Sequence, residues 1–234
     1  MSAELDWPAA MAGLARRAGQ RLEGAPAQDI LEWAVATFGD GLVVATSLQD
    51  GVLVHLASQV RPGIDVVFLD TGYHFAETLG MRDAVASMQP VRLLSIEPAL
   101  TREEQDAIYG PRLYERDPDK CCMLRKVQPL ARALEPYTAW VTGVRRVEAP
   151  TRRRTRPVEW DEKRGMVKVN PIVDWTDDDV EAYIDKHGVL VNPLREEGYL
   201  SIGCAPCTRR VAPGEPARAG RWAGTGKVEC GLHG

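Results

Sequence analysis

Five cysteines are the residues of this sequence whose type and spacing bear most directly on chemistry. Four of them form two pairs, and the fifth lies near the end of the chain: Cys121 and Cys122, Cys204 and Cys207, and Cys230. Four thiolates are the number that holds a structural zinc ion or an iron–sulfur cluster. The spacing therefore predicts four metal-binding sulfurs and leaves Cys230 as a candidate nucleophile.

The adjacent cysteines favour an iron–sulfur cluster over zinc. Neighbouring residues on a helix project about 100° apart, so two adjacent thiolates chelate a single ion only with strain. A cubane accepts one thiolate at each of its four irons. We expect Cys121 and Cys122 near the start of a helix over 120–134, where the helix dipole favours thiolates. A zinc knuckle, a redox-active CxxC pair and buried free cysteines remain alternatives on spacing alone.

Polar side chains accompany these thiols. Lys126 follows Cys122 by four residues and therefore shares its face of the predicted helix, within reach of a cluster and of an anion bound in front of it. Cys230 lies between Glu229 and His233, and a thiolate near an imidazolium is a competent nucleophile. The alternatives are a solvated surface lysine and an incidental surface cysteine.

Polar loops follow two of the predicted strands. The strand over 42–46 leads into Ser47 and Asp50, and the strand over 64–69 leads into Thr71 and Gly72. Hydroxyl groups and backbone amides at the carboxyl edge of a parallel sheet form sites for anions and ribose. Together these loops predict a nucleotide site at that edge.

Arginines cluster although the formal net charge is -4. They gather at 145–146 and 152–154, and again at 209–210 and 218–221. Guanidinium groups bind phosphate or sulfate oxygens through two hydrogen bonds, so the clusters predict an anionic ligand. The net negative charge argues against general nucleic-acid binding.

Strands and helices alternate along most of the chain. Predicted helices cover 5–22, 27–38, 51–60, 74–88, 120–134 and 176–187, with one more opening at a capping box, Thr101 to Glu104. Predicted strands cover 42–46, 64–69, 91–96, 138–142 and 167–169. Apolar strands that alternate with helices imply an α/β fold with a parallel sheet covered on both faces.

The whole chain, 1–234, is expected to form one domain, preceded by helices within 1–40 and ending in a mobile arm over 208–234 that carries Cys230. Glycine and proline are frequent over 206–226, which disfavours a regular element there. The sequence has no apolar run of bilayer length and no secretory pattern at its start. We therefore expect a cytoplasmic protein without a membrane partner, whose thiols stay reduced.

The motifs together resemble the APS/PAPS reductase family and, within it, the iron–sulfur branch of assimilatory adenylyl-sulfate (APS) reductases. The resemblance runs from about residue 40 to the end. Its motifs are Phe68-Leu-Asp-Thr-Gly-Tyr-His74, Cys121-Cys122-Met-Leu-Arg-Lys126, Trp140-Val-Thr-Gly143, Ile202-Gly-Cys204-Ala-Pro-Cys207 and Glu229-Cys-Gly-Leu-His233. The resemblance implies a Rossmann-like parallel sheet of the adenine-nucleotide α-hydrolase type with a flexible C-terminal tail.

The resemblance also implies a reaction. One [4Fe–4S] cluster per chain is held by Cys121, Cys122, Cys204 and Cys207, and Cys230 attacks the sulfur of APS. AMP leaves, and reduced thioredoxin releases sulfite from the S-sulfocysteine for cysteine biosynthesis. The implied substrate contacts are Ser47, Asp50, Thr71, Gly72, Lys126, Gly143, Arg152, Arg218, Arg221 and His233. Because the sequence continues only one residue past His233, we expect thioredoxin to be a separate protein.

Three other functions compete with this one. A PAPS reductase typically shares the Cys230 motif but lacks the other four cysteines. An iron–sulfur redox sensor would keep the cluster and a vestigial pocket, and a zinc-stabilised nucleotidyl transferase would hold a different metal. The loop after the first strand lacks the glycine-rich pattern of ATP-splitting relatives, which argues against ATP hydrolysis. A homo-oligomer is compatible with the sequence.

Overall fold

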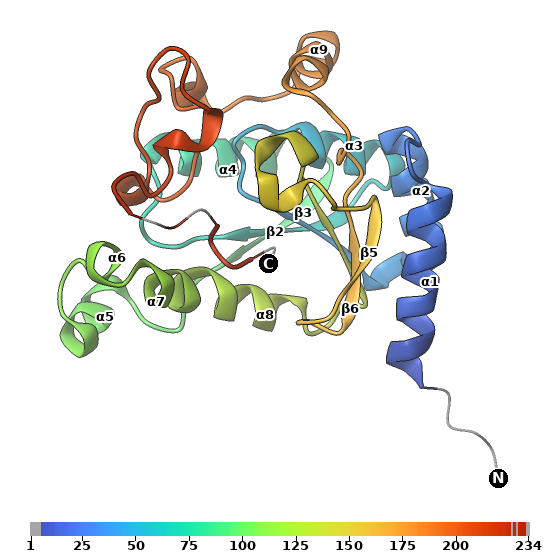
Figure 1. Cartoon of the computed structure of the whole chain (residues 1–234), viewed down its shortest axis with the longest axis horizontal. Helices are drawn as coiled ribbons and strands as arrows, with labels where there is room; N and C mark the ends of the chain where they lie inside the picture. The colour runs from blue at the N-terminus through green and yellow to red at the C-terminus, as the bar shows by residue number, and fades with distance from the viewer. Residues whose placement is uncertain (1–5, 226, 228, 233–234) are drawn as a thin grey trace.

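The computed structural model describes residues 6–225, 227 and 229–232, and a six-stranded sheet forms their centre (Figure 1). The strand order is β3-β2-β1-β4-β6-β5. The strands are β1 (Leu42–Thr46), β2 (Ile64–Leu69), β3 (Val91–Ile96), β4 (Ala139–Thr142), β5 (Val158–Asp161) and β6 (Met166–Val169). Strands β1, β2, β3, β4 and β6 run parallel, and β5 pairs antiparallel to β6 at one edge. The predicted Rossmann-like parallel sheet is confirmed.

Helices cover both faces of the sheet. They are α1 (Trp7–Arg21), α2 (Ala27–Phe38), α3 (Val52–Val60), α4 (Ala76–Met88), α5 (Arg102–Tyr109), α6 (Leu113–Arg116), α7 (Pro118–Cys122), α8 (Gln128–Leu134) and α9 (Asp177–His187). Neighbouring strand residues point to opposite faces. Val44 accordingly belongs to the larger core under α1 to α4, and Val43 to the smaller core under α8. No described helix combines the length and apolar character needed to cross a bilayer.

The strand order reverses beside β1, which lies between β2 and β4. The connection after β1 leads to β2 on one side of it, whereas β4 pairs on its other side. The loops that leave the carboxyl ends of β1 and β4 therefore diverge. Ligands of open parallel sheets bind in the crevice that such diverging loops create.

Local sequence signals position several helices. Thr101 caps α5 by accepting the Glu104 N–H at 3.1 Å, and the Glu104 carboxylate accepts the Thr101 N–H at 2.8 Å. Thr176 and Asp179 form the equivalent pair at the start of α9. The capping box predicted at Thr101 is confirmed, because each side chain satisfies a backbone donor that the helix leaves free.

The helix predicted over 120–134 is interrupted. It begins at Pro118 as α7, passes through a π-helical turn at Met123–Val127 and continues as α8. One wider turn changes the direction of side chains relative to a regular helix. Residues 74 and 75 also precede α4 rather than open it, and Leu5, where the first helix was predicted to begin, lies outside the described residues.

Strand β5 was not predicted: its four residues alternate between apolar and charged side chains, but a run this short carries a weak strand signal. Its position depends on pairing with β6 and on cover from α1. Gly19 of α1 lies so close to β5 that a Cβ atom there would sit 2.2 Å from the Val158 carbonyl oxygen. The absence of a side chain at Gly19 thus permits α1 to brace the sheet edge.

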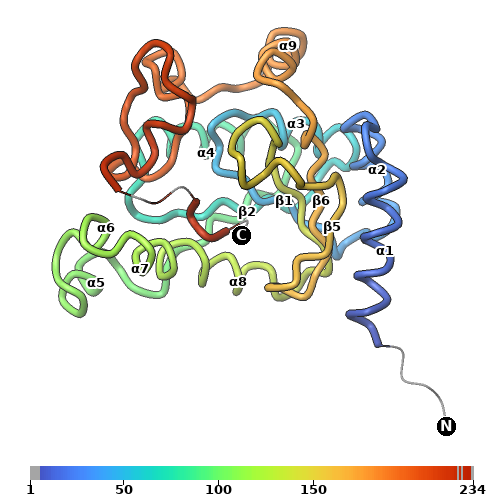
Figure 2. Tube along the Cα trace, in the orientation of Figure 1, coloured from blue at the N-terminus to red at the C-terminus, as the bar shows by residue number. Residues whose placement is uncertain are grey.

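The segment after residue 203 has little regular structure, as predicted. It contains short 3-10 turns at Ala205–Cys207 and Ala217–Gly220 and a bridge between Thr208 and Arg221. Figure 2 shows its red trace returning to the centre of the molecule. There Leu232 packs against the smaller core. The segment therefore reaches the crevice beside β1.

Candidate functional site

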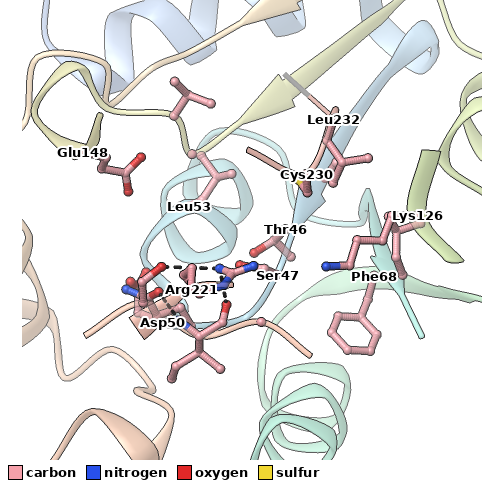
Figure 3. Close-up of a pocket in the computed structure, with 18 of the residues that line it drawn as sticks. Thr46, Ser47, Asp50, Leu53, Phe68, Lys126, Glu148, Arg221, Cys230 and Leu232 are labelled. Atoms are coloured by element: carbon pink, nitrogen blue, oxygen red, sulfur yellow. Dashed lines mark hydrogen bonds between the residues drawn. The ribbon is translucent and has the colours of Figure 1, made fainter. Parts of the chain in front are cut away.

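A pocket of about 220 Å³ opens at the carboxyl ends of β1, β2 and β4. Its walls come from the loops after these strands, from the π-helical turn and from the C-terminal segment (Figure 3). Most of the predicted site residues line it: Ser47, Asp50, Thr71, Lys126, Gly143, Arg152, Arg218, Arg221 and Cys230. Folding therefore gathers residues that are up to 183 positions apart, the difference between 230 and 47.

Of the two remaining predicted contacts, only Gly72 belongs to the described residues. Gly72 is not among the residues that line the pocket. It lies in the turn after Thr71 with φ of +72°, and its N–H donates to Asp70 Oδ1 at 3.0 Å. Gly72 therefore shapes the loop that presents Thr71. His233 lies outside the described residues, so its predicted contact is untested.

The loop after β1 is held by its own side chains. Leu48 adopts a left-handed backbone conformation with φ of 55°, is buried, and its N–H donates to Thr46 Oγ1 at 3.1 Å. Asp50 Oδ1 accepts the Val52 N–H at 3.1 Å at the start of α3. Burial raises the pKa of Asp50, and the nearby Arg195 opposes this only in part. This environment suits a carboxyl group that exchanges hydrogen bonds with a neutral polar ligand such as ribose.

Lys126 projects into the pocket from the π-helical turn, opposite Arg221 (Figure 3). It is 8% exposed. Burial alone would lower the pKa of the ammonium, but the sulfur atoms of Cys204 and Cys230 outweigh it and raise this pKa. A buried cation beside the Cys230 thiol is suited to an anionic ligand.

Several pocket donors have no acceptor within the described residues. They are Arg145 Nη1, Arg221 Nε and Trp222 Nε1. Trp222 is 4% exposed and, like Leu48, has a left-handed backbone with φ of 49°. Gly203 lets Arg221 lie across the chain, because a Cβ there would be 2.3 Å from Arg221 Nη2. Buried donors without acceptors carry a free-energy cost, which an anion bound in the pocket would relieve.

Ion pairs between arginines and carboxylates form another part of the pocket wall. Arg152 pairs with Glu148 and with Glu229, and Arg218 also contacts Glu229 at 3.2 Å. Burial lowers the pKa of Arg218, and the positive charge of Arg152 adds to this effect. Four residues of the wall were not predicted individually as site residues: Arg145, Glu148, Trp222 and Glu229. Arg145 and Glu229 belonged to motifs already noted, whereas Glu148 and Trp222 carried no separate signal.

The other four cysteines line a second, small cavity: Cys121, Cys122, Cys204 and Cys207. Lys126 borders both cavities. Thr71 Oγ1 lies 3.3 Å from Cys204 Sγ, which links the substrate-side loop to this group. Cys204 also lines both cavities, and Cys230 is the one cysteine that does not line the small cavity.

Burial governs the chemistry of these thiols. It raises the pKa of Cys121 to about 12, with a further contribution from the neighbouring cysteines. It likewise raises the pKa of Cys207 to about 11. Cys121 and Cys122 lie near the start of the continuous helix that begins at Pro118, as predicted. Burial nevertheless raises the pKa of both thiols. Four crowded thiols, three of them buried, become thiolates readily only when bound cations compensate their charge.

The arrangement does not match a site for one ion. Among the described residues, no three cysteine, histidine, aspartate or glutamate side chains are placed to hold a single metal ion. The four irons of a cubane occupy separate corners, so their thiolates need not converge on one point. Four cysteines around one cavity, three buried and one half-buried, supply the four thiolate donors that a cluster takes.

Comparison with known proteins shows which family has this fold and pocket. The family model described as the phosphoadenosine phosphosulfate reductase domain matches residues 41–210, and the chain belongs to this family. The matched region contains β1 to β6 and the four clustered cysteines. The chain is thus an oxidoreductase.

The curated relatives are named more narrowly. The adenosine 5'-phosphosulfate reductase of Streptomyces coelicolor is 59% identical over 221 residues, with 94% of each chain covered. The protein of that name from Mycolicibacterium smegmatis is 56% identical over 220 residues, which cover 94% of this chain and 93% of that one.

Solved structures agree on the fold. The phosphoadenylyl-sulfate (PAPS) reductase of Candida auris, solved as a phosphate complex, has a TM-score of 0.69 at 29% identity and covers 82% of this chain and 96% of that chain. The FMN adenylyltransferase of Candida glabrata, with FAD and pyrophosphate, has a TM-score of 0.58 at 12% identity, covering 89% of this chain and 69% of that one. The adenylyltransferase shares the fold alone.

Proposed function

We propose that the protein reduces adenylyl sulfate (APS) to sulfite and AMP, with Cys230 as the nucleophile. The observation that carries the proposal is the separation of the thiols. Cys230 lines the larger pocket together with Lys126 and Arg221 and is absent from the small cavity, which the four other cysteines line; of these four, Cys204 also reaches the larger pocket. The names of the curated relatives support APS as the substrate.

The residues of the pocket suit each part of this substrate. Ser47 and Asp50, at the carboxyl edge of the sheet, are placed to bind the ribose and adenine. Arg145 and Arg221 offer unpaired donors to the phosphate and sulfate oxygens. Lys126 is placed to offset the negative charge that a thiolate meets as it approaches a sulfate group.

In the proposed reaction the Cys230 thiolate attacks the sulfur of APS, and a sulfur–sulfur bond forms. The bond between that sulfur and the phosphate oxygen breaks, and AMP leaves with its electron pair. A thiolate of reduced thioredoxin then attacks Cys230 Sγ and releases sulfite. The second thioredoxin thiol resolves the mixed disulfide, so thioredoxin is oxidised as the sulfonate sulfur is reduced. We place the reaction in the cytoplasm, as part of sulfate assimilation for cysteine biosynthesis.

One [4Fe–4S] cluster per chain is proposed for Cys121, Cys122, Cys204 and Cys207. The fit rests on four cysteines around one cavity, three buried and one half-buried, and on the adjacency of Cys121 and Cys122, which suits separate irons better than one ion. When bound, the cluster would supply compensating charge and electrostatic tuning beside Lys126. Both electrons for the reduction come from thioredoxin thiols.

Mass spectrometry tests the nucleophile directly. Protein incubated with APS and no reductant should carry one sulfonate group, which peptide mapping should locate on Cys230. The Cys230→Ser variant should form no adduct and release no sulfite while it retains its iron after anaerobic purification. An adduct on another residue, or sulfite release by Cys230→Ser, would exclude the proposed nucleophile.

Three measurements separate the competing functions. A clear preference for PAPS over APS in turnover would favour the PAPS reductase alternative. A redox sensor would keep its function in Cys230→Ser, and metal analysis would expose a zinc-stabilised transferase. Iron-free protein with full activity would contradict the proposed cluster.

A further inference from the structure

Glu229, the residue before Cys230, holds together two arginines of the pocket wall. Its carboxylate accepts hydrogen bonds from Arg152 Nε at 2.8 Å and Nη2 at 2.9 Å, and from Arg218 Nη2 at 3.2 Å. The Thr151 hydroxyl donates to the same carboxylate at 3.4 Å. Two-point guanidinium–carboxylate contacts are among the strongest polar contacts in proteins, so Glu229 is a fixed point of the C-terminal segment.

Arg152 is itself anchored on its other side. Its Nη1 contacts Glu148, which also lies 3.6 Å from Arg145. All three guanidinium nitrogens of Arg152 thus face protein carboxylates. The side chains of Arg152 and Glu229 are only 10% and 18% exposed, so water and salt screen their pairing weakly. Arg152 is better placed to hold the chain than to bind a ligand.

Cys230 lies between two attachments. On one side Glu229 is bound to the arginines, and on the other Leu232 packs against the smaller core under α8. Figure 3 shows Cys230 and Leu232 on the same side of the pocket, above Lys126. With both neighbours attached, the backbone of Cys230 has little freedom to move its thiol away from the pocket.

We propose that Glu229 is a positioning residue, which seats the Cys230 thiol in the pocket by joining Arg152 to Arg218. The inference rests on the proposed function, in which Cys230 is the nucleophile. It assigns Arg152 to holding Glu229 instead of contacting the substrate. Holding a nucleophile near its attack position lowers the barrier because orientation is arranged before the reaction.

The Glu229→Gln variant tests the anchor, that is, the contacts of Glu229 with Arg152 and Arg218, in an experiment that needs no catalytic turnover. Glutamine keeps the size of the side chain but removes the charge that binds two guanidinium groups. In ligand-free protein, iodoacetamide should label Cys230 about tenfold faster than in the parent, the ratio that corresponds to 1.4 kcal/mol. Peptide mapping measures this rate at Cys230 alone. An unchanged labelling rate would overturn the proposal.

The chain offers a matched control. Glu215 forms a two-point pair with Arg209 at 2.8 and 3.0 Å in the same arm, and neither residue lines the pocket. Glu215→Gln should therefore leave the labelling of Cys230 unchanged. Arg152→Lys keeps the positive charge but loses the two-point contact, and it should label as fast as Glu229→Gln. Combining Glu229→Gln with Arg152→Lys should add little, because both changes break the same anchor.

A second measurement addresses the competing explanation that Glu229 only keeps anions out. APS binding is measured by calorimetry in Cys230→Ser protein with and without Glu229→Gln. If Glu229 positions the Cys230 thiol, the two proteins should bind APS with similar affinity. With Cys230 present, Glu229→Gln should form the adduct more slowly than the parent in single turnovers. Tighter APS binding with unchanged Cys230 labelling would contradict the positioning role. If the parent forms no adduct with APS while the labelling contrast persists, the proposed function fails and the anchor stands.

Discussion

Among single residues, Lys126 differs from the other cations of the pocket in the groups that face its charge. Arg152 and Arg218 are paired with carboxylates, and Arg221 donates to the Ile202 carbonyl at 3.2 Å. Lys126 is buried beside cysteine sulfurs that raise the pKa of its ammonium against the effect of burial. A permanent positive charge is thus held where a thiolate and a sulfate group would meet.

Removing this charge should slow the first chemical step. We predict that Lys126→Ala binds APS more weakly and forms the Cys230 adduct about a hundredfold more slowly, the usual effect of losing one preorganised charge. Rapid-quench mass spectrometry in single turnovers measures the rate. Lys120→Ala is the control, because Lys120 is exposed on α7 and lies over the Tyr109 ring at 4.4 Å. Equal adduct rates in parent and Lys126→Ala would refute this role.

At the scale of elements, α9 closes the pocket by packing on α3. Val180 of α9 lines the pocket. His55 Nδ1 on α3 lies 2.7 Å from the Tyr183 hydroxyl on α9, and the His55 and His187 rings are 5.4 Å apart. Burial lowers the pKa of His55, and the nearby His187 lowers it further. The contact between these helices therefore favours neutral His55.

This contact should make stability depend on pH. The folded pKa of His55 is below the ordinary value of about 6.5, so the unfolded chain binds more protons between the two values and stability falls as pH is lowered through that range. We predict that the Tm loss between about pH 7.5 and 5.5 is smaller in His55→Phe than in the parent. Calorimetry at both pH values measures it. His74, whose pKa burial also lowers, is present in both proteins and serves as the internal reference. Identical losses would show that His55 does not titrate on unfolding.

At the scale of the whole molecule, the pocket depends on a sheet that is braced at its edge. The loop over 143–157, which carries Arg145 and Arg152, connects β4 to β5. Strand β5 is held by β6 and by α1, where Gly19 approaches the Val158 carbonyl. Because this loop ends at β5, packing of α1 on β5 helps to hold Arg145 and Arg152 in the pocket wall.

A pair of alanine substitutions in α1 tests this brace. Gly19→Ala should destabilise the protein by about 1–3 kcal/mol, because its Cβ meets backbone that cannot turn away. Gly13→Ala in the same helix meets only the end of the Arg17 side chain at 3.3 Å. It should stabilise the protein by up to about 1 kcal/mol through helix propensity. Urea unfolding measures both, and a stabilising Gly19→Ala would show that α1 does not press on β5.

Local sequence patterns were enough to predict the alternation of strands and helices and the parallel sheet, and they set Cys230 apart from the two cysteine pairs. These features follow from local periodicity, capping and residue spacing, which a chain carries whatever its distant contacts. The arm around Cys230 was also located, because glycine and proline disfavour regular elements. Its predicted mobility stays a prediction.

The contacts of the site residues follow from how distant segments pack together. The π-helical turn, the short strand β5 and the burial of Lys126 depend on packing between distant segments, which local propensity does not encode. The same holds for Glu229, whose partners Arg152 and Arg218 lie 77 and 11 positions away. The sequence does not distinguish an arginine that binds a ligand from one that pairs with a carboxylate. The difference depends on which carboxylates the fold places beside it.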